Sequence, residues 1–385
     1  MLHMIRWHQL SPRQQPSETR HQDPDMRGFP FARFSRVCRK ERGPNVPIRE
    51  KAHSHISPAG AAKYAARSIA MILNTGSRTD IPAFYSEWFA NRLREGFCLV
   101  RNPYNPSLVT RYRLDPSVVD VLSFCSKNPL PMLAYQALLK PYRQFWHVTI
   151  TPYGRDIEPH VPPAAQVMEI FRRLSETVGK DSVVWRYDPV FISEAYSVEF
   201  HIHAFRQMAR ALRGYTGQCV VSFIDLYEKT MRNFPGVCRV TPQQQETLIA
   251  AFAQTAQENH MQIHLCCESA SLARPGVDAD GCFSQSVLEK SLYIHLQVPK
   301  TVRARSACPC LLGADIGAYN TCSHGCLYCY ANYDAESVRQ NRLRHDPSSP
   351  MLIGHLRPED TVKEAEQHSF LDPQMTLDDL LSGRS

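Results

Sequence analysis

Residues 314–332 read ADIGAYNTCSHGCLYCYAN, a stretch that joins a predicted strand to a metal-binding pattern. The strand is expected over residues 314–319, and the loop after it carries C-x-x-x-C-x-x-C as Cys322, Cys326 and Cys329. Thiolates are soft, anionic ligands that favour iron–sulfur clusters or zinc. Spacings this short let one loop cap three irons of a cubane cluster and leave the fourth iron open.

Upstream of this stretch, short β-branched or aromatic runs alternate with helical patterns. Strands are predicted at residues 72–75, 121–126, 146–151, 183–187, 220–225, 262–266 and 314–319. Helices are predicted at residues 83–94, 131–139, 164–178, 198–212, 242–259 and 284–290, and a hairpin-like insertion at 97–114. This alternation predicts an α/β fold with parallel strands and crossover helices. The size of the region matches a (β/α) barrel of the TIM type, full or partial, and a doubly wound open sheet is the alternative.

The chain divides into three regions by composition. Residues 1–70 contain 13 Lys/Arg and 5 Asp/Glu, whereas the other 315 residues contain 31 and 32. We expect residues 1–70 to be a basic, disordered extension, or to precede the true start of translation at Met71. A partner-binding arm and a transit peptide are two other interpretations of this segment. Residues 71–333 form the predicted barrel, and residues 334–385 a C-terminal helix and tail. The near-neutral barrel argues against a large nucleic-acid footprint without excluding nucleic acid as a partner.

The cysteine content bears on the compartment. The chain has 13 cysteines, no run of about 18 apolar residues and no apolar signal region at its N-terminus. We therefore expect a soluble, cytoplasmic protein that does not enter a membrane and uses its clustered cysteines for metal or redox chemistry.

Polar residues follow most of the predicted strands. In a parallel barrel all these strand ends lie on one face, which is where catalytic residues are placed. Taken singly, each polar residue is also a common strand cap or turn former. The candidate catalytic residues are Arg78, Asp80, Lys127, Asn128, Arg186, Asp188 and Glu268. The Arg and Lys side chains would suit an anionic group on the substrate.

The segment with Cys322, Cys326 and Cys329 resembles the signature of radical S-adenosylmethionine (SAM) enzymes, including the aromatic Tyr328 before the third cysteine. The run CLYCYA is particularly similar to the spore photoproduct lyase branch. The resemblance implies a [4Fe-4S] cluster, SAM bound near Tyr328, a 5′-deoxyadenosyl radical, and a reductant such as flavodoxin or ferredoxin. It departs from the superfamily in position, because the triplet usually lies near the start of the barrel.

A wider resemblance accounts for that position. The stretch GSRTDIPAFYSEWFANRLREGFCLVRNPYNP (residues 76–106), SKNP (126–129) and the cysteine segment resemble a bacterial family called domain of unknown function 1848. The resemblance covers residues 71–333 and implies no established reaction, so the small-molecule or macromolecular substrate stays open. If the barrel is circularly permuted, strand 314–319 should lie parallel and next to strand 72–75.

Four more cysteines form a second candidate set. Cys266, Cys282, Cys308 and Cys310 lie on loops or strand ends that a barrel brings to one rim, where they would close an auxiliary cluster or a zinc site. Cys267 is left out because it should point away if the strand continues. Structural zinc is also the alternative for the first triplet, with His324 or a nearby cysteine as the fourth ligand. The second functional hypothesis is thus a non-enzymatic iron–sulfur or zinc-binding protein.

Overall fold

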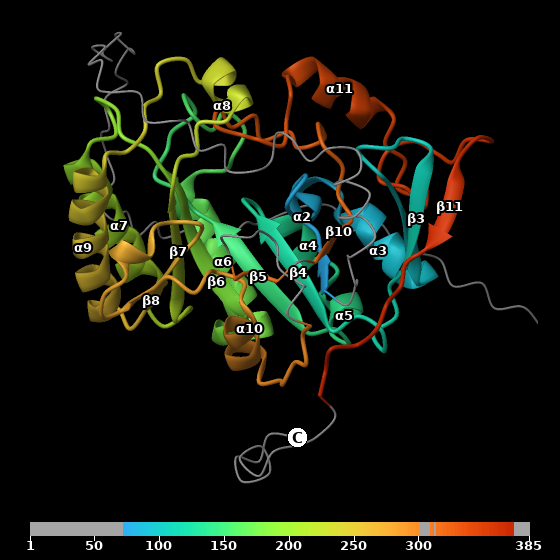
Figure 1. Ribbon diagram of the computed structural model, residues 1–385, viewed down its shortest axis with the longest axis horizontal. Helices are drawn as coiled ribbons and strands as arrows, with labels where there is room; N and C mark the ends of the chain where they lie inside the picture. The colour runs from blue at the N-terminus through green and yellow to red at the C-terminus, as the bar shows by residue number, and fades with distance from the viewer. Residues whose placement is uncertain (1–71, 300–308, 312, 373–385) are drawn as a thin grey trace, which may run out of the picture. The chain divides into compact units, whose positions relative to one another are not determined.

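The computed structural model describes residues 72–299, 309–311 and 313–372, all within one compact unit. Its centre is an eight-stranded sheet with the order β10-β1-β4-β5-β6-β7-β8-β9, in which every neighbouring pair is parallel (Figure 1). The strands are β1 (Ile72–Asn74), β4 (Val121–Ser126), β5 (Gln144–Thr149), β6 (Val183–Val190), β7 (Gln218–Phe223), β8 (Gln262–Leu265), β9 (Val277–Asp278) and β10 (Ala314–Asp315). The predicted α/β fold with a parallel sheet is confirmed.

Helices connect the strands. They are α2 (Ile81–Phe84), α3 (Ser86–Glu95), α4 (Leu130–Leu133), α5 (Gln136–Leu139), α6 (Ala164–Val178), α7 (Val198–Leu212), α8 (Glu228–Asn233), α9 (Pro242–Glu258), α10 (Gln285–Leu292) and α11 (Ala335–Leu343). Two short 3-10 helices occupy Lys180–Ser182 and Ala270–Leu272. The α6 and α7 bounds agree with the sequence prediction, because both helices are strongly amphipathic and α7 begins at a Ser197 cap. None of the helices in these described ranges is long and apolar enough to cross a membrane.

Alternation along the strands gives the sheet two unlike faces. On one face, residues such as Trp146, Trp185 and Val221 pack in the main hydrophobic core, which includes residues of α3, α6, α7 and α9. On the opposite face, Phe145 and Val184 belong to a separate apolar cluster that includes residues of α10. Because successive strand residues point to opposite faces, this second face also carries the polar side chains that follow toward the carboxyl ends of the strands. They are Ser123, His147, Arg186, Asp188, Ser222 and His264.

The pairing of β10 with β1 joins the last strand of the main sheet in sequence order to the first. Leu73 pairs with Ala314 and Asn74 with Asp315, both in parallel register. The predicted adjacency of these two strands is therefore confirmed. No sheet closes in the described residues, since β9 and β10 are the two edges, so the barrel itself is not confirmed.

The insertion after α3 forms a second sheet. Strands β2 (Phe97–Arg101) and β3 (Leu108–Arg113) pair antiparallel, as predicted for a hairpin. Strand β11 (Thr361–Glu364) adds to β3 in parallel, which the prediction of a simple C-terminal helix and tail did not include. Arg101 fixes this arrangement through an ion pair with Asp360. Residues beyond 333 therefore contribute a strand as well as the expected helix, α11.

Candidate metal centre and strand-end site

The loop with Cys322, Cys326 and Cys329 follows β10 at the carboxyl ends of the parallel strands. Its backbone pairs with the segment after β5: Leu327 N donates to the Ile157 carbonyl at 3.0 Å, and His160 N to the His324 carbonyl at 3.1 Å. On the other side, the Tyr85 hydroxyl donates to the Thr321 carbonyl at 2.7 Å. These bonds come from distant parts of the chain, so the cysteine loop has a defined position at the end of the sheet.

Asp80 links the first strand to this loop. One carboxylate oxygen accepts the Ala83 N–H at 3.0 Å and caps α2. The other accepts the Lys127 N–H and lies 2.8 Å from Nε2 of His324. Asp80 and His324 are both buried, so this predicted candidate acts as the anchor between β1, β4 and the cysteine loop.

A second anchor is the buried carboxylate of Glu158. Its Oε1 accepts hydrogen bonds from Lys127 Nζ at 2.8 Å, Thr151 Oγ1 at 2.7 Å and the Tyr328 hydroxyl. Burial would lower the pKa of Lys127, but Glu158 and Cys326 outweigh it, so its pKa is raised and the ammonium stays charged. The ring of Tyr328 lies under this ammonium, 5.6 Å from its centroid. Lys127 and Tyr328 are thereby brought beside the cysteine loop.

The three cysteines of the loop are free thiols. Burial raises the pKa of Cys322, Cys326 and Cys329, and for Cys322 the neighbouring charges of Asp80 and Cys329 raise it further. Deprotonating three such thiols together requires a cation, which is what a metal or an iron–sulfur cluster provides. As they lie, no three His, Cys, Asp or Glu side chains of the described residues form a ready-made metal-binding group. Around one cubane cluster the three sulfurs would lie within about 6–7 Å of one another, and this convergence stays a prediction.

Arg186 and Asp188 form an ion pair near the end of β6, on the polar side of the sheet. Ser222 donates to the same Asp188 carboxylate. Burial would raise the pKa of Asp188, but Arg186 outweighs it and the pKa is lowered, so the carboxylate is charged at neutral pH. Nε of Arg186 is buried and has no hydrogen-bond partner in the described ranges, which leaves one donor for an added oxygen ligand.

The other three candidate catalytic residues have local partners. Arg78 lies 3.7 Å from Asp315, so it ties the end of β1 to the end of β10. The Asn128 side chain accepts the Leu130 N–H at 3.3 Å, as in an Asx turn. Glu268 accepts the Phe223 N–H at 3.0 Å and joins the ends of β7 and β8. These contacts stabilise the turns and strand ends in which the three residues lie. A catalytic role for them stays a prediction.

Three members of the second cysteine set lie together. Sγ of Cys282 is 3.5 Å from Sγ of Cys266 and 3.9 Å from Sγ of Cys310. Cys308 lies outside the described residues. The premise for leaving out Cys267 is wrong, because β8 ends at Leu265 and Cys267 adopts a left-handed φ of 62°. The side chain of Cys267 interacts with that of Cys266 and raises the pKa of the Cys266 thiol.

Sequence reasoning missed Glu158, Thr151 and His324 as structural members of the site. Glu158 lies nine residues beyond β5 in a loop without periodic pattern, and its partners are set by the tertiary fold. His324 sits between the first two cysteines, a position that suggests a metal ligand and gives no sign of its contact with Asp80. The one available signal was the stretch TPYGRDIEPH, which follows a fully buried strand and therefore starts at the same sheet edge.

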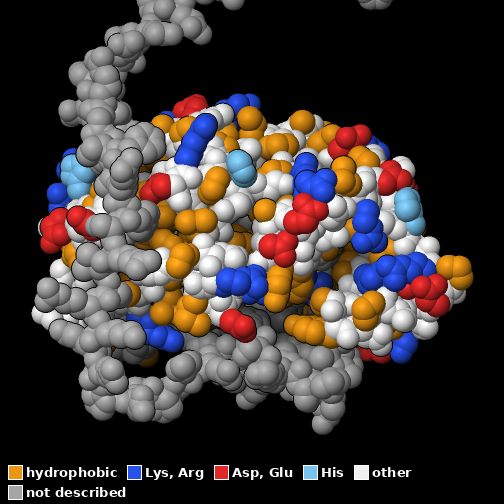
Figure 2. All heavy atoms as spheres, turned by 90° about the horizontal axis from the view of Figure 1, so that it is seen from above, with side chains coloured by type: hydrophobic (Ala, Val, Ile, Leu, Met, Phe, Trp, Pro, Cys, Tyr) orange, Lys and Arg blue, Asp and Glu red, His pale blue; other side chains and the backbone are white. Residues whose placement is uncertain are grey.

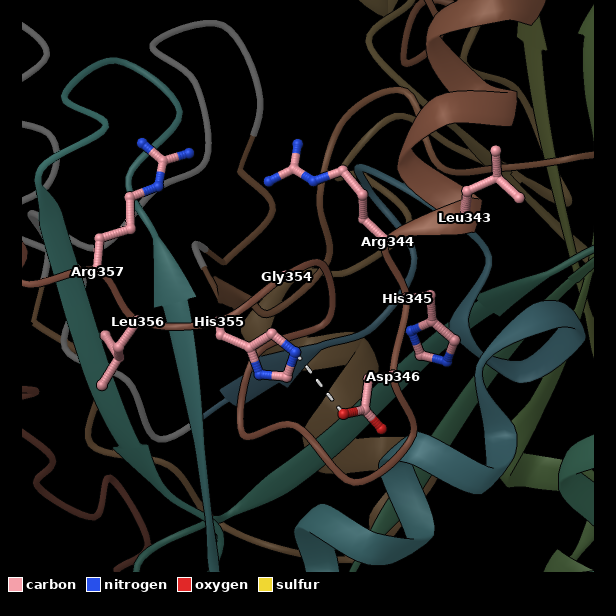
Figure 3. Close-up of a pocket in the computed structure, with 8 residues that line it drawn as sticks. All are labelled: Leu343, Arg344, His345, Asp346, Gly354, His355, Leu356 and Arg357. Carbon is pink, nitrogen blue, oxygen red and sulfur yellow. Dashed lines mark ion pairs between the residues drawn. The ribbon is translucent and has the colours of Figure 1, made fainter.

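Two surface hollows are lined by other residues. One, of about 470 Å³, is lined by residues on either side of the turn before β11; it contains Asp346 3.8 Å from His355, with Arg344 and Arg357 on its rim (Figure 3). The other, of about 600 Å³, includes Lys140 and Tyr293. Neither is lined by a cysteine or by a candidate catalytic residue. On the side that carries α8 and α11, basic and acidic side chains are interspersed with hydrophobic ones (Figure 2).

A family model described as a domain of unknown function (DUF1848) matches residues 72–331. No curated protein matches the chain. Three structures of the carboxyl transferase domain of Rhizobium etli pyruvate carboxylase are similar at TM-scores of 0.24, 0.22 and 0.22 and identities of 12%, 9% and 10%. They cover 60–61% of this chain, which spans 44%, 39% and 38% of their length. At such TM-scores these structures carry no argument about fold or function.

Proposed function

Since the chain belongs to the DUF1848 family, a domain of unknown function, we propose that it is a radical SAM iron–sulfur enzyme. In this proposal Cys322, Cys326 and Cys329 hold a [4Fe-4S] cluster, and Tyr328 lies near the adenine of SAM. The observation that carries the proposal is the position of the cysteine loop directly after β10, at the carboxyl ends of the parallel strands. Ligands of parallel α/β folds bind at that edge.

We further propose that the sheet is a circularly permuted partial barrel. The parallel pairing of β10 with β1 supports this, because it makes the cysteine strand the neighbour of the first strand in the sequence. The order from β10 through β8 then runs as successive parallel strands, each reached by a helical crossover except at the permuted step. In this reading, the face with Arg186 and Asp188 is the interior of the barrel.

The donor set suits a cluster with one open iron. The loop supplies three free thiols at short spacings, the number that leaves one iron of a cubane cluster open. When bound, the cluster and SAM would supply a 5′-deoxyadenosyl radical. The protein's own residues bind and orient: Asp80 and His324 hold the loop, and Lys127 with Glu158 keeps a paired charge beside Cys326.

The substrate would lie over the strand ends. The free Nε donor of Arg186 and the charged Asp188 suit a polar substrate with an anionic oxygen, which Arg would bind through a charge-assisted hydrogen bond. The electron donor, such as flavodoxin or ferredoxin, is part of the same proposal.

Anaerobic reconstitution tests the cluster. The full chain and the Cys322→Ala variant are reconstituted with iron and sulfide, reduced, and followed by iron content and by EPR with and without SAM. We expect about four irons per chain and an EPR signal that SAM changes, both lost in the variant. Cys98→Ala is the matched control, because Cys98 is a free, buried thiol in the other sheet. A reconstituted wild-type protein that stays colourless and binds no iron would refute the proposal, whatever zinc it holds elsewhere.

A further inference from the structure

We infer that Cys266, Cys267, Cys282 and Cys310 bind a single thiophilic metal ion of the zinc class, at a site separate from the Cys322–Cys329 loop. This inference goes beyond the proposed function and does not depend on it. The two cysteine sets belong to different parts of the packing: Cys282 and Cys310 lie in the apolar cluster under α10, whereas Leu327 and Tyr328 pack with Ile157 and Phe191.

The distances between the sulfur atoms distinguish a site for one metal ion from a site for an iron–sulfur cluster. Four thiolates around one ion with metal–sulfur bonds of about 2.3 Å are about 3.8 Å apart along each edge of the tetrahedron. Sγ of Cys282 is 3.5 Å from Cys266 and 3.9 Å from Cys310, on either side of that value. In a cubane cluster each thiolate caps a different iron, which separates the sulfurs by about 6–7 Å. The spacing therefore favours one ion over a second cluster.

Cys267 supplies the fourth thiol. Its side chain interacts with that of Cys266, so the two adjacent cysteines lie close together. Consecutive strand residues would point to opposite sides, but the φ of 62° at Cys267 turns the backbone immediately after β8. A left-handed φ is unusual for a residue other than glycine and is found where the surrounding structure requires it.

The surroundings of the thiols resemble those of a closed structural site. Cys282 and Cys310 are 5% and 7% exposed, and they pack with Phe145, Val184 and Leu288. Structural zinc sites are fully coordinated and shielded in this way, whereas catalytic zinc keeps an open position. The four thiols come from three segments of the chain, so a metal here would join the end of β8, the loop before α10 and the segment before β10.

Groups around the thiols would orient and neutralise them. The Phe283 N–H donates to Sγ of Cys310 at 3.2 Å, and Nη1 of Arg186 lies 3.8 Å from Sγ of Cys282. Nε2 of His147 is 3.2 Å from the Cys282 carbonyl and fixes that loop. N–H donors to sulfur and a nearby cation both stabilise thiolate ligands. The described residues hold no ready-made group of three ligands, so the thiol side chains must rotate toward a common centre as the ion binds.

The site is tested in a full chain that cannot build the first cluster. Cys322, Cys326 and Cys329 are replaced by Ser in that parent chain, and bound zinc is measured after anaerobic purification. We expect about one zinc per parent chain, and Co²⁺ in its place should give the absorption of a tetrahedral thiolate site. Adding Cys282→Ala should weaken zinc binding by more than the roughly 10–100-fold that loss of an outer partner costs. Adding Cys98→Ala should leave zinc binding unchanged.

Folding is followed alongside metal content, so that a misfolded variant is recognised. The Cys310→Ser variant provides a second ligand substitution, smaller in size than Cys282→Ala, that should also weaken zinc binding. A chelator should lower the melting temperature of the parent chain but not of the Cys282→Ala chain. A parent chain without zinc would overturn the inference. So would retention of zinc in both ligand variants, binding of iron with sulfide at this site, or a metal-free protein in which two of the four thiols are joined as a disulfide.

Discussion

Asp80 is a single carboxylate that accepts hydrogen bonds from Ala83 and Lys127 and contacts His324, so it joins three segments of the site. Asp80→Ala removes all three contacts and leaves a buried N–H and imidazole without their partner. We expect a loss of about 3 kcal/mol in the free energy of unfolding, measured with urea. Asp80→Asn keeps an acceptor oxygen and should lose less. Equal stability of the Ala variant and the wild type would contradict this role.

Lys127 and Glu158 form a buried ion pair at 2.8 Å. Replacing only Glu158 by Leu, or only Lys127 by Met, leaves one buried charge without its partner, which should cost about 3–5 kcal/mol of stability. Replacing both residues, as Lys127→Met with Glu158→Leu, removes both buried charges together. A double-mutant cycle measured by chemical unfolding should therefore give a total loss well below the sum of the two single losses. Additive losses would mean that the pair is not coupled in the folded protein.

Asp188 makes stability depend on pH in the acidic range. Its folded pKa is lowered, because Arg186 and Ser222 outweigh the effect of burial. A carboxyl group with a lower pKa in the folded than in the unfolded protein stabilises the fold at pH values above its unfolded pKa, which is about 3.9 for Asp. This stabilisation is lost as the pH falls through the pKa of the folded protein. The stability difference between wild type and Asp188→Asn should thus be largest near neutral pH and shrink below about pH 4. A difference that stays constant from pH 7 to pH 3 would contradict this.

At the scale of single residues, the sequence identifies reactive side chains better than their partners. The cysteine spacing and the polar strand ends are local patterns, so Cys322, Asp80 and Lys127 could be selected from them. Glu158 could not, because its three donors come from β4's end, β5's end and the cysteine loop. A strand that continued would turn Cys267 away from Cys266, and only the backbone φ of Cys267 overturns that expectation.

The bend that follows β1 brings the backbone of Gly76 very close to Cys125 of β4. A Cβ at this position would lie 2.4 Å from the Cys125 carbonyl oxygen and 2.5 Å from its Cβ. Gly76→Ala should therefore displace the end of β1 and cost at least about 1–3 kcal/mol of stability in a thermal or urea unfolding experiment.

Gly217 provides the control for that substitution. A Cβ at Gly217 would meet nothing within 4 Å, and its backbone is not in the left-handed region. Gly217→Ala should change stability by no more than about 0.4–1 kcal/mol, in the stabilising direction. Equal losses in the two variants would show that the effect at Gly76 is not steric.

Helices and strands with a strongly periodic pattern of apolar residues could be predicted from the sequence. The pairing of strands far apart in the sequence could be predicted only in part. The bounds of β4, α6 and α7 follow from local patterns and caps. The pairing of β10 with β1 was expected from the order of the motifs. The addition of β11 to β3 was not, because its exposed sequence Thr361–Glu364 has no buried face to reveal it. Closure of the main sheet depends on edge contacts that no local pattern encodes.

At the scale of the molecule, the two sets of cysteines flank the same row of polar strand-end residues. Arg186 is close to Cys282 of one set, whereas Lys127 lies beside Cys326 of the other. The charge of Lys127 also contributes to the lowered pKa of Asp188, so these two strand-end residues interact. In the proposed account, a structural metal on one side and a cluster on the other would place the substrate site between them.

Reductive cleavage of SAM tests the central claim most directly. The anaerobically reconstituted full chain is reduced with SAM present, and 5′-deoxyadenosine is quantified against the Cys326→Ala and Cys98→Ala variants. The account predicts 5′-deoxyadenosine from the wild type and from Cys98→Ala, and none above background from Cys326→Ala. A wild-type protein that carries a full cluster on Cys322, Cys326 and Cys329 yet forms no 5′-deoxyadenosine would contradict it.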